Sequence, residues 1–190
     1  NNMRLLFTYL ACVFLGGMSV NVFAQDKVIF EDDFNHSKKF EKNWFDNSTE
    51  EKTGKIEYKK KGGIDNSGCV KISNPERGAI RIMHSLNNLE PGKLYRMSAM
   101  MKCVGVKEGR GAVIYLNPDG LEQGWNASKF VYDDMEWSEI YMDFVPNQKG
   151  EATICCALGF PWGTYNGGKA LGEAYYDNVR VEPIGDKLYH

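Results

Sequence analysis

The chain has 190 residues with 23 basic and 25 acidic side chains, which give a formal net charge of −2. Because neither a basic stripe nor a basic helix is present, the sequence indicates neither nucleic acid nor an anionic membrane surface as a partner. The length beyond the first 24 residues suits one domain with a sizeable core.

The N-terminal segment has the composition of a secretory signal peptide. Arg4 precedes an apolar run that ends at Val20, and Val22 and Ala24 occupy the two positions that a signal peptidase reads. We therefore expect residues 1–24, of which the first two are extraneous, to be removed. The protein would then be secreted, periplasmic or on the cell surface of a Gram-negative bacterium. The alternative is a membrane anchor, but polar residues interrupt a run that is already short for about 30 Å of hydrocarbon, so no membrane span is expected.

The rest of the chain reads as a series of short β-strands. No window carries a sustained helical repeat, and turn clusters rich in glycine, proline, asparagine and aspartate separate the β-rich runs. This pattern predicts an all-β antiparallel sandwich or barrel in residues 25–184 and a C-terminal tail in residues 185–190. A long irregular loop is expected at residues 119–136. The nine β-rich runs are residues 27–34, 54–61, 69–73, 79–84, 94–106, 111–117, 137–145, 152–160 and 173–181.

Four cysteines follow the predicted leader. Cys103 and Cys156 share the parity of core positions, whereas Cys69 and Cys155 have the opposite parity. Adjacent strand residues point to opposite faces, so Cys155 and Cys156 point apart. We favour four free thiols, and one disulfide among them is the alternative, because exported proteins can carry such bonds.

The last β-rich run places a carboxylate where an apolar side chain is expected. In strand register Tyr175, Val179 and Val181 share one face and Tyr176 lies on the other, which puts Asp177 on the apolar face. A buried carboxylate is normally paired, hydrogen-bonded or bound to a metal. The alternation therefore predicts a partner for Asp177.

Several segments, taken in order, resemble one family. The stretches "NLEPGKLYRMSAMMKC", "EWSEIYMDFV" and "AYYDNVRVE" follow one another, and "FEDDFN" with Trp44 and "NSGCVKIS" extend the match to nearly the whole mature chain. Together they resemble the galactose-binding-domain-like carbohydrate-binding modules, the group that contains families 4, 9 and 22. The resemblance implies a jelly-roll β-sandwich that binds glycans without catalysis.

The resemblance also implies a structural calcium ion that joins the first strand, the loop before the third strand and the last strand. Its ligands would be the carbonyl of Asp33, the side chain of Asn35, Asp65, the carbonyl of Gly68 and the carboxylate of Asp177. Such an all-oxygen set is the kind that calcium prefers. The family often has Glu where this chain has Asn35, which lowers the expected affinity. The alternative is that Asp177 accepts hydrogen bonds from backbone amides of the first strand.

Two glycine-rich irregular stretches carry the candidate sugar-binding tryptophans, Trp125 and Trp162. By resemblance they line a cleft on the concave sheet, where aromatic faces stack on sugar rings and polar groups orient the hydroxyls. The alternative is that they only cover the sandwich edge. The other candidates for ligand contact are Arg81, Tyr115, Gln123, Asn126 and Tyr165. For Arg81 and Tyr115 the alternative is a solvated strand face.

Two further tryptophans, Trp44 and Trp137, are interpreted as structural. Trp137 begins a strand in which Ile140, Met142 and Phe144 alternate with polar positions. The related modules keep an aromatic residue there for packing. Both side chains are therefore expected to support the sandwich rather than to bind ligand.

Two other classes of function remain open. A glycoside hydrolase, or the leading module of one, would need two convergent carboxylates, and acids near the presumed cleft are expected by chance among 25. The chain has three histidines and no nucleophile elbow. A cell-surface adhesion or scaffolding domain would bind protein instead. The favoured partner is a polysaccharide or oligosaccharide, and an appended or partner glycanase is left open.

Overall fold

The computed structural model describes residues 27–46, 54–117, 126–160 and 168–186. The predicted signal peptide lies outside the described residues, as do Gln123, Trp125, Trp162 and Tyr165. The elements are β1 (Phe30–Asp32), α1 (Ser37–Asn43), β2 (Phe45–Asp46), β3 (Lys55–Lys59), the 3-10 turn η1 (Ile64–Asn66), β4 (Cys69–Gly78), β5 (Ile80–Leu86), β6 (Lys93–Lys107), β7 (Ala112–Leu116), β8 (Asp133–Phe144), β9 (Ala152–Leu158) and β10 (Ala170–Asp186). None of the helices in these ranges has the length and apolar character that a membrane crossing requires.

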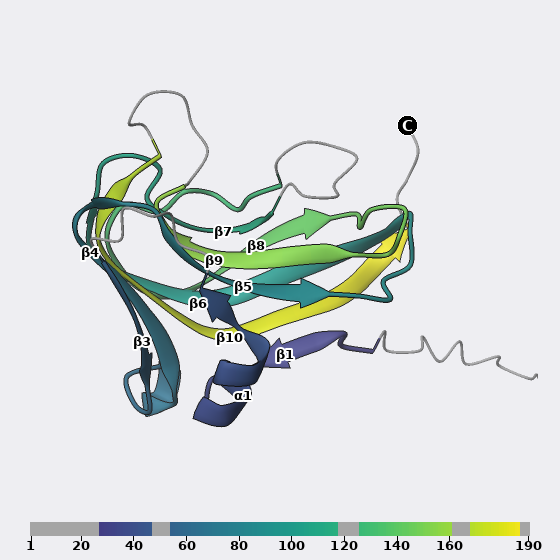
Figure 1. Ribbon diagram of the computed structural model, residues 1–190, viewed down its shortest axis with the longest axis horizontal. Coiled ribbons are helices and arrows are strands. Elements are labelled where there is room, and N and C mark those ends of the chain that lie inside the picture. Colours follow the sequence, from purple (N-terminus) through teal and green to yellow (C-terminus); the bar gives the residue numbers. More distant parts are fainter. Residues whose placement is uncertain (1–26, 47–53, 118–125, 161–167, 187–190) are drawn as a thin grey trace, which may run out of the picture.

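The strands form two antiparallel sheets (Figure 1). The six-stranded sheet has the order β3-β4-β10-β6-β8, and β1 pairs with β10 as well; the four-stranded sheet has the order β2-β5-β9-β7. β1 and β4 pair with different stretches of the same edge of β10, which meets β4 through Ala170–Tyr176 and β1 through Val179–Val181. The predicted all-β jelly-roll sandwich is confirmed.

The core lies between the two sheets. Ile80, Ile82 and Ile154 from the four-stranded sheet belong to the same buried cluster as Met97 and Ile72 from the six-stranded sheet. This inward alternation is what a strand with one buried face produces. The core therefore fills the space between the sheets, and each sheet has one outer face that does not belong to this core.

The predicted alternation in β10 is wrong before Asp177. Tyr176, not Tyr175, is the buried core residue, and its hydroxyl donates to Ala157 O of the opposite sheet at 2.5 Å. The cause is a β-bulge: Asn178 has a left-handed φ of 48°, and the register with β6 shifts between Asp177 and Arg180. Asp177 therefore lies on the outer face of the six-stranded sheet, on the side of Tyr175.

The sequence patterns missed three short elements, α1, β2 and η1, and misplaced several strand boundaries. Helix α1 has seven residues, too few for a helical repeat to be recognised, and β2 has two. β8 begins at Asp133, inside the expected loop. β10 continues to Asp186, into the segment that was assigned to the C-terminal tail.

The cysteine parities are confirmed. Cys103 and Cys156 lie in the central core, Cys155 lies in a second cluster on the outer face of the four-stranded sheet, and Cys69 is buried near Asp177. All four are free thiols in the structure. Burial raises the pKa of Cys103 to about 12 and that of Cys69 to about 11, so these thiols are poor nucleophiles at neutral pH.

Candidate functional site

Asp177 lies at a junction in the six-stranded sheet. β4 leaves the edge of β10 at Tyr176 and β1 joins it at Val179, so neither strand pairs with Asp177. The loop between β3 and β4 closes this gap. We call the set formed by Asp33, Asn35, residues 63–68 and Asp177 the junction site.

The Asp177 carboxylate is fully buried and accepts three hydrogen bonds. Its Oδ2 accepts from the backbone N–H of Ile64 at 3.0 Å and from the Ser67 hydroxyl at 2.7 Å, and its Oδ1 accepts from the N–H of Asn178 at 2.7 Å. In the alternative to calcium, the expected donors to Asp177 were amides of the first strand. The backbone donors instead come from the 63–67 loop and from the bulge, because the loop lies over the junction.

Burial is the main cause that raises the pKa of Asp177, and the nearby Asp33 carboxylate raises it further, while the three hydrogen bonds lower it. Among the described residues, no Lys, Arg or His side chain forms an ion pair with Asp177. The carboxylate therefore has its hydrogen-bond partners but lacks a compensating positive charge within the described part of the chain.

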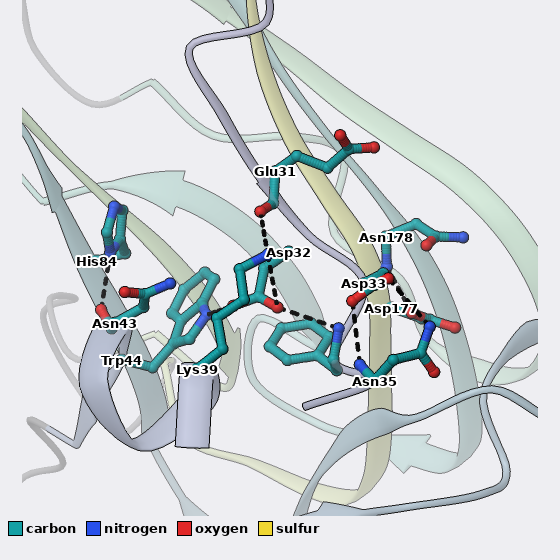
Figure 2. A network of polar contacts seen from close by, with 11 residues as sticks. Glu31, Asp32, Asp33, Asn35, Lys39, Asn43, Trp44, His84, Asp177 and Asn178 are labelled. Carbon is teal, nitrogen blue, oxygen red and sulfur yellow. Dashed lines mark hydrogen bonds and ion pairs between the residues drawn. The ribbon is translucent and has the colours of Figure 1, made fainter. Parts of the chain in front are cut away.

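The loop that follows β1 also reaches the junction site, through Asp33 and Asn35 (Figure 2). The Asp33 carboxylate accepts from the backbone N–H of Asn35 at 3.1 Å and from its Nδ2 at 3.0 Å. Asn35 Oδ1 in turn accepts from the N–H of Gly68 at 3.0 Å. The pKa of Asp33 is lowered, mainly by the hydrogen bond from the Asn35 N–H, and the lowered pKa keeps this carboxylate ionised. These bonds tie the loop after β1 to the start of β4.

Two glycines make the close packing of the junction site possible. A Cβ at Gly63 would lie 2.5 Å from Asp177 Oδ2, and a Cβ at Gly68 would collide with the carbonyl of Phe34. Between them, Asp65 and Asn66 have left-handed φ angles of 52° and 63°. These angles turn the loop back over β10, and aspartate and asparagine tolerate them better than most residues do.

The structure brings four of the five residues predicted to bind calcium together, but the bonds at Asp33 involve its carboxylate instead of the predicted carbonyl, and Gly68 takes part through its N–H. Asp33, Asn35 and Gly68 are linked by hydrogen bonds, and Asp177 joins them through the Ile64–Ser67 turn. Asp65 is exposed on that turn, and its carboxylate makes no hydrogen bond or ion pair with the described part of the chain. Within the same part, no three His, Cys, Asp or Glu side chains cluster as a metal site would require. The oxygen chemistry nevertheless fits a hard cation, since two carboxylates, an amide and a carbonyl lie at the junction.

A second network beside the junction site is structural. Asp32 is fully buried and accepts from Trp44 Nε1 at 3.0 Å and from the N–H of Phe34 at 3.1 Å, and Lys39 Nζ lies 3.6 Å from it (Figure 2). The Trp44 ring also packs against Phe34, with centroids 5.7 Å apart. The expected structural role of Trp44 is confirmed by its burial and by this bond.

His84 joins this network to the four-stranded sheet. Its ring is stacked on Phe30 of β1, with centroids 3.9 Å apart, and its Nδ1 lies 2.7 Å from the carbonyl of Asn43 (Figure 2). Burial is the main cause that lowers its pKa. His84 therefore packs one sheet against the other and is not aimed at a ligand.

The outer face of the four-stranded sheet carries a second buried cluster. We call this surface the four-stranded face. On it Arg81 Nη1 donates to the Tyr115 hydroxyl at 3.0 Å, and Tyr115 is fully buried while Arg81 is 7% exposed. Burial raises the pKa of Tyr115 well above its ordinary range, so the phenol stays protonated. The apolar members of the cluster are Met83, Val113, Cys155, Ala157 and Phe160, with Ala127 and Phe130 packed against them.

The described ends of the two tryptophan-bearing stretches lie on this face or at its edge. Asn126, which directly follows Trp125, accepts from the N–H of Leu116 at 2.9 Å through its carbonyl. Phe160, which precedes Trp162 by two positions, packs edge-on against Tyr115 with centroids 4.9 Å apart. The structure therefore places Arg81 and Tyr115 on this face, whereas Asn126 lies at the edge of β7 and its side chain points to β8 of the other sheet. Contact between Gln123, Trp125, Trp162 or Tyr165 and a ligand stays a prediction, because these residues lie outside the described ranges.

The polar groups of this face already have protein partners. Arg81 and Tyr115 are bonded to each other and buried, and Asn126 Nδ2 donates to the carbonyl of Asp143 at 3.3 Å. Arg81 and Tyr115 thus form the floor of the face rather than protruding from it. The alternative of a solvated strand face is wrong for both residues, because both are buried, and the sequence contained no signal for this burial.

Trp137 does not lie in the core, contrary to the structural role expected for it. Its side chain is partly exposed, and its ring meets Tyr175 edge-on with centroids 6.5 Å apart. Trp137 alternates with the buried Ile140 and Met142, and this alternation places it on the outer face of the six-stranded sheet. The parity shared with Glu139 and Tyr141 was the signal that the sequence contained.

Comparison with known proteins identifies the fold. Neither a protein-family model nor a curated protein sequence matches this chain. Among solved structures, the chain is similar to the CBM22-1 xylan-binding domain of Xyn10C from Paenibacillus barcinonensis, with a TM-score of 0.58, 9% identity, and coverage of 85% of this chain and 97% of that one. It is also similar to the family 11 carbohydrate-binding module from Clostridium thermocellum in complex with a β-1,3-1,4-mixed-linked tetrasaccharide, with a TM-score of 0.50, 17% identity, and coverage of 86% and 98%.

A third similar structure belongs to a larger protein. It is the enzymatically active domain of tailspike protein 4 from bacteriophage CBA120, with a TM-score of 0.55, 16% identity, and coverage of 79% of this chain but 21% of that one. The chain thus spans about a fifth of the tailspike domain and nearly all of each binding module. At these identities the similarity concerns the fold, and it confirms the resemblance that the sequence motifs indicated: the chain has the jelly-roll β-sandwich of carbohydrate-binding modules.

Proposed function

We propose that the protein is a non-catalytic carbohydrate-binding module, which binds a polysaccharide or oligosaccharide on the four-stranded face and holds a structural calcium ion at the junction site. One observation carries the glycan proposal. The segments next to the two tryptophan-bearing stretches meet on the four-stranded face, where the rings of Phe130 and Phe160 pack edge-on with centroids 5.9 Å apart. Xylan-binding and tetrasaccharide-bound modules share this fold. An aromatic rim above a rigid floor is a common arrangement for sugar binding.

The residues on this face support binding rather than hydrolysis. A glycosidase places two carboxyl groups on either side of the scissile bond. Apolar side chains surround the Arg81–Tyr115 pair on this face, and the buried carboxylates of the described chain, Asp32 and Asp177, lie elsewhere, at and beside the junction site. The floor thus offers packing and rigidity for a sugar-binding surface.

The junction site supports calcium for a different reason. Asp177 is buried beside Asp33 without a described cationic partner, and both carboxylates share the junction with the oxygens of Asn35 and Gly68. A divalent ion bound by these oxygens would compensate the negative charge and cross-link the β1 loop, the 63–68 loop and β10. Asp65, which is exposed, would have to rotate toward the site to contribute.

The proposed location follows from the N-terminal segment. A cleaved leader would deliver the module to the periplasm, the cell surface or the medium, where polysaccharides are available. Export is checked by N-terminal sequencing of protein made in a Gram-negative host. Gln25 at the terminus supports it, and an intact leader in the membrane fraction contradicts it.

Affinity gel electrophoresis against plant and host polysaccharides tests the glycan proposal. Retardation by at least one neutral polysaccharide is expected, with dissociation constants of about micromolar to millimolar, since ordering costs offset much of the stacking energy. A reducing-sugar assay on the same polysaccharides separates binding from hydrolysis. Sugar release by the purified protein would favour the glycosidase alternative, and failure to bind any polysaccharide would favour an adhesion domain.

A further inference from the structure

The outer face of the six-stranded sheet carries an aromatic pair and a groove that neither the core nor the junction site uses. Trp137 of β8 is partly exposed and meets Tyr175 of β10 edge-on. Large aromatic side chains that stay exposed on a strand are candidates for ligand contact, because their apolar surface is otherwise left against water. This face lies on the opposite side of the sandwich from the four-stranded face.

A groove of about 450 Å³ lies next to this pair. It runs across β3, β4 and β10, which are neighbours in the sheet, and its walls include Lys55, Glu57, Ser73, Pro75, Leu171 and Glu173. Its volume falls within the range of about 300–1,000 Å³ that is typical of small-molecule sites. Gly172 shapes the floor, since its φ of 114° and a close approach to the Gly105 carbonyl exclude a side chain there.

Direct contacts join the groove to the aromatic pair. The Tyr175 hydroxyl donates to Glu173 Oε2 at 2.7 Å, and Glu173 Oε1 lies 2.5 Å from Lys71 Nζ. Lys71 Nζ also lies 5.6 Å from the centroid of the Tyr175 ring. The groove wall and the aromatic pair therefore form one continuous surface, held together by these contacts.

The charges on this surface are balanced. Lys71 is paired with Glu173, and Lys102, which faces Tyr175 across the β10–β6 ladder, is paired with Glu136 at 3.0 Å. A surface with paired charges gives no net attraction to a phosphate or to an acidic chain. It does offer several oriented donors and acceptors beside an aromatic ring, which suits a neutral polyol.

We propose that this face is a second glycan-binding site, in which Trp137 stacks on one neutral sugar unit and the groove bounded by Glu173, Ser73 and Glu57 takes the next unit of the chain. This second site rests on the proposed function only for the class of ligand, a glycan. Its residues belong to the six-stranded sheet, whereas the proposed cleft lies on the four-stranded face. Two sites on opposite faces would let one module engage two glycan chains at once and raise its avidity for insoluble polysaccharide.

Nuclear magnetic resonance of the four tryptophan indole N–H groups tests this site directly. The signals of ¹⁵N-labelled protein are assigned with single Trp→Phe variants and followed during titration with xylohexaose, cellohexaose and a β-1,3-1,4-mixed-linked tetrasaccharide. The Trp137 signal is expected to shift and saturate with at least one of these sugars. It is also expected to do so in the Trp125→Phe/Trp162→Phe double variant.

Trp137→Ala should weaken binding at this face about five-fold to 150-fold, as is typical when an aromatic platform for stacking is removed. Tyr141→Ala is the matched control. Tyr141 lies on the same strand and the same face and is 56% exposed, but the guanidinium of Arg96 covers its ring at 4.3 Å from the centroid. Its removal should leave affinity unchanged.

The outcomes separate this site from the four-stranded face. If the Trp125 and Trp162 signals respond and the Trp137 signal does not, the second site is wrong while the proposed function stands. If the Trp137 signal responds alone, the second site stands and the predicted cleft is wrong. If no tryptophan responds to any of the three sugars, the second site is overturned together with binding of these glycans.

Discussion

The junction site and the four-stranded face each bury a charged side chain, but they surround it with different partners. Asp177 has three hydrogen-bond donors but no described cationic partner, and a second carboxylate lies nearby. Arg81 is buried against a neutral phenol within an apolar cluster. The first arrangement stays electrostatically incomplete and suits a bound cation, whereas the second is a closed and rigid floor. In the proposed function the junction site serves stability and the four-stranded face serves recognition, and the following variants test that division.

The largest effect is expected for Trp44→Ala, beside the junction site. The variant removes a buried indole and one of the donors to the buried Asp32 carboxylate, so the free energy of unfolding should fall by about 3–5 kcal/mol. Urea denaturation measures this loss. Trp137→Ala is the matched control and should cost much less, because Trp137 is partly exposed. Equal losses would show that the outer face carries as much packing energy as the core.

Asp177→Ala should have the next largest effect. It leaves the N–H of Ile64, the Ser67 hydroxyl and the N–H of Asn178 without their acceptor, at a cost of about 1–3 kcal/mol for buried donors. It should also abolish any rise of the melting temperature on adding calcium, since a ligand that binds only the folded state stabilises it by mass action.

Calorimetry of verified metal-free protein, with and without calcium, measures the response. Asp65→Ala refines the ligand set: a weakened calcium response means that the exposed Asp65 turns inward, and an unchanged response removes it from the set. A wild-type melting temperature that is the same with calcium and with chelator would rule out the ion.

Tyr115→Phe tests whether the floor of the four-stranded face touches ligand. Loss of the hydroxyl that accepts from Arg81 should lower the free energy of unfolding by about 0.5–1.5 kcal/mol. Glycan affinity should change little, because Tyr115 is fully buried. Titration calorimetry checks this. A tenfold loss of affinity at unchanged stability would make Tyr115 a direct ligand contact.

A smaller, pH-dependent effect is expected at His84, which packs between the two regions. Its pKa is lowered in the folded state by burial, against opposing contributions from the Asn43 carbonyl and Asp32. The unfolded chain therefore takes up a proton first as the pH falls, and stability should decrease from about pH 6.5 downward through the folded-state pKa. In His84→Gln this part of the pH dependence should disappear. The exposed His36→Gln variant should keep it, and thermal melts between pH 5 and 8 compare the two.

The sequence predicted the strands well because short β-rich runs and turn clusters are local signals. It did not predict the bulge at Asn178, which reverses the alternation in β10 and moves Tyr176 into the core. An asparagine beside Asp177 was the available sign, since asparagine tolerates a left-handed φ. Two of the three donors to Asp177, Ile64 and Ser67, come from residues about 110 positions earlier, and no local pattern encodes such a contact.

The sequence also predicted the candidate sites only in part, because the contacts that complete them join residues far apart in the chain. The family resemblance grouped Asp33, Asn35, Gly68 and Asp177, which lie together in the structure, and it named Arg81 and Tyr115, which are bonded to each other. Burial of Arg81 depends on how residues 126–131 and Phe160 pack on that face, which parity cannot show. Trp137 was assigned to packing by analogy, although its parity with Tyr141 already indicated the outer face.

Isothermal titration of xylohexaose and a β-1,3-1,4-mixed-linked tetrasaccharide into the wild type and into Trp125→Ala/Trp162→Ala tests the central claim most directly. Binding of at least one sugar to the wild type is expected. In the double variant affinity at the four-stranded face should fall by about 1–3 kcal/mol or more, while the melting temperature stays close to the wild-type value. The account would be contradicted if the wild type bound neither sugar nor any polysaccharide in the affinity gels, or if the double variant bound with unchanged affinity and stoichiometry.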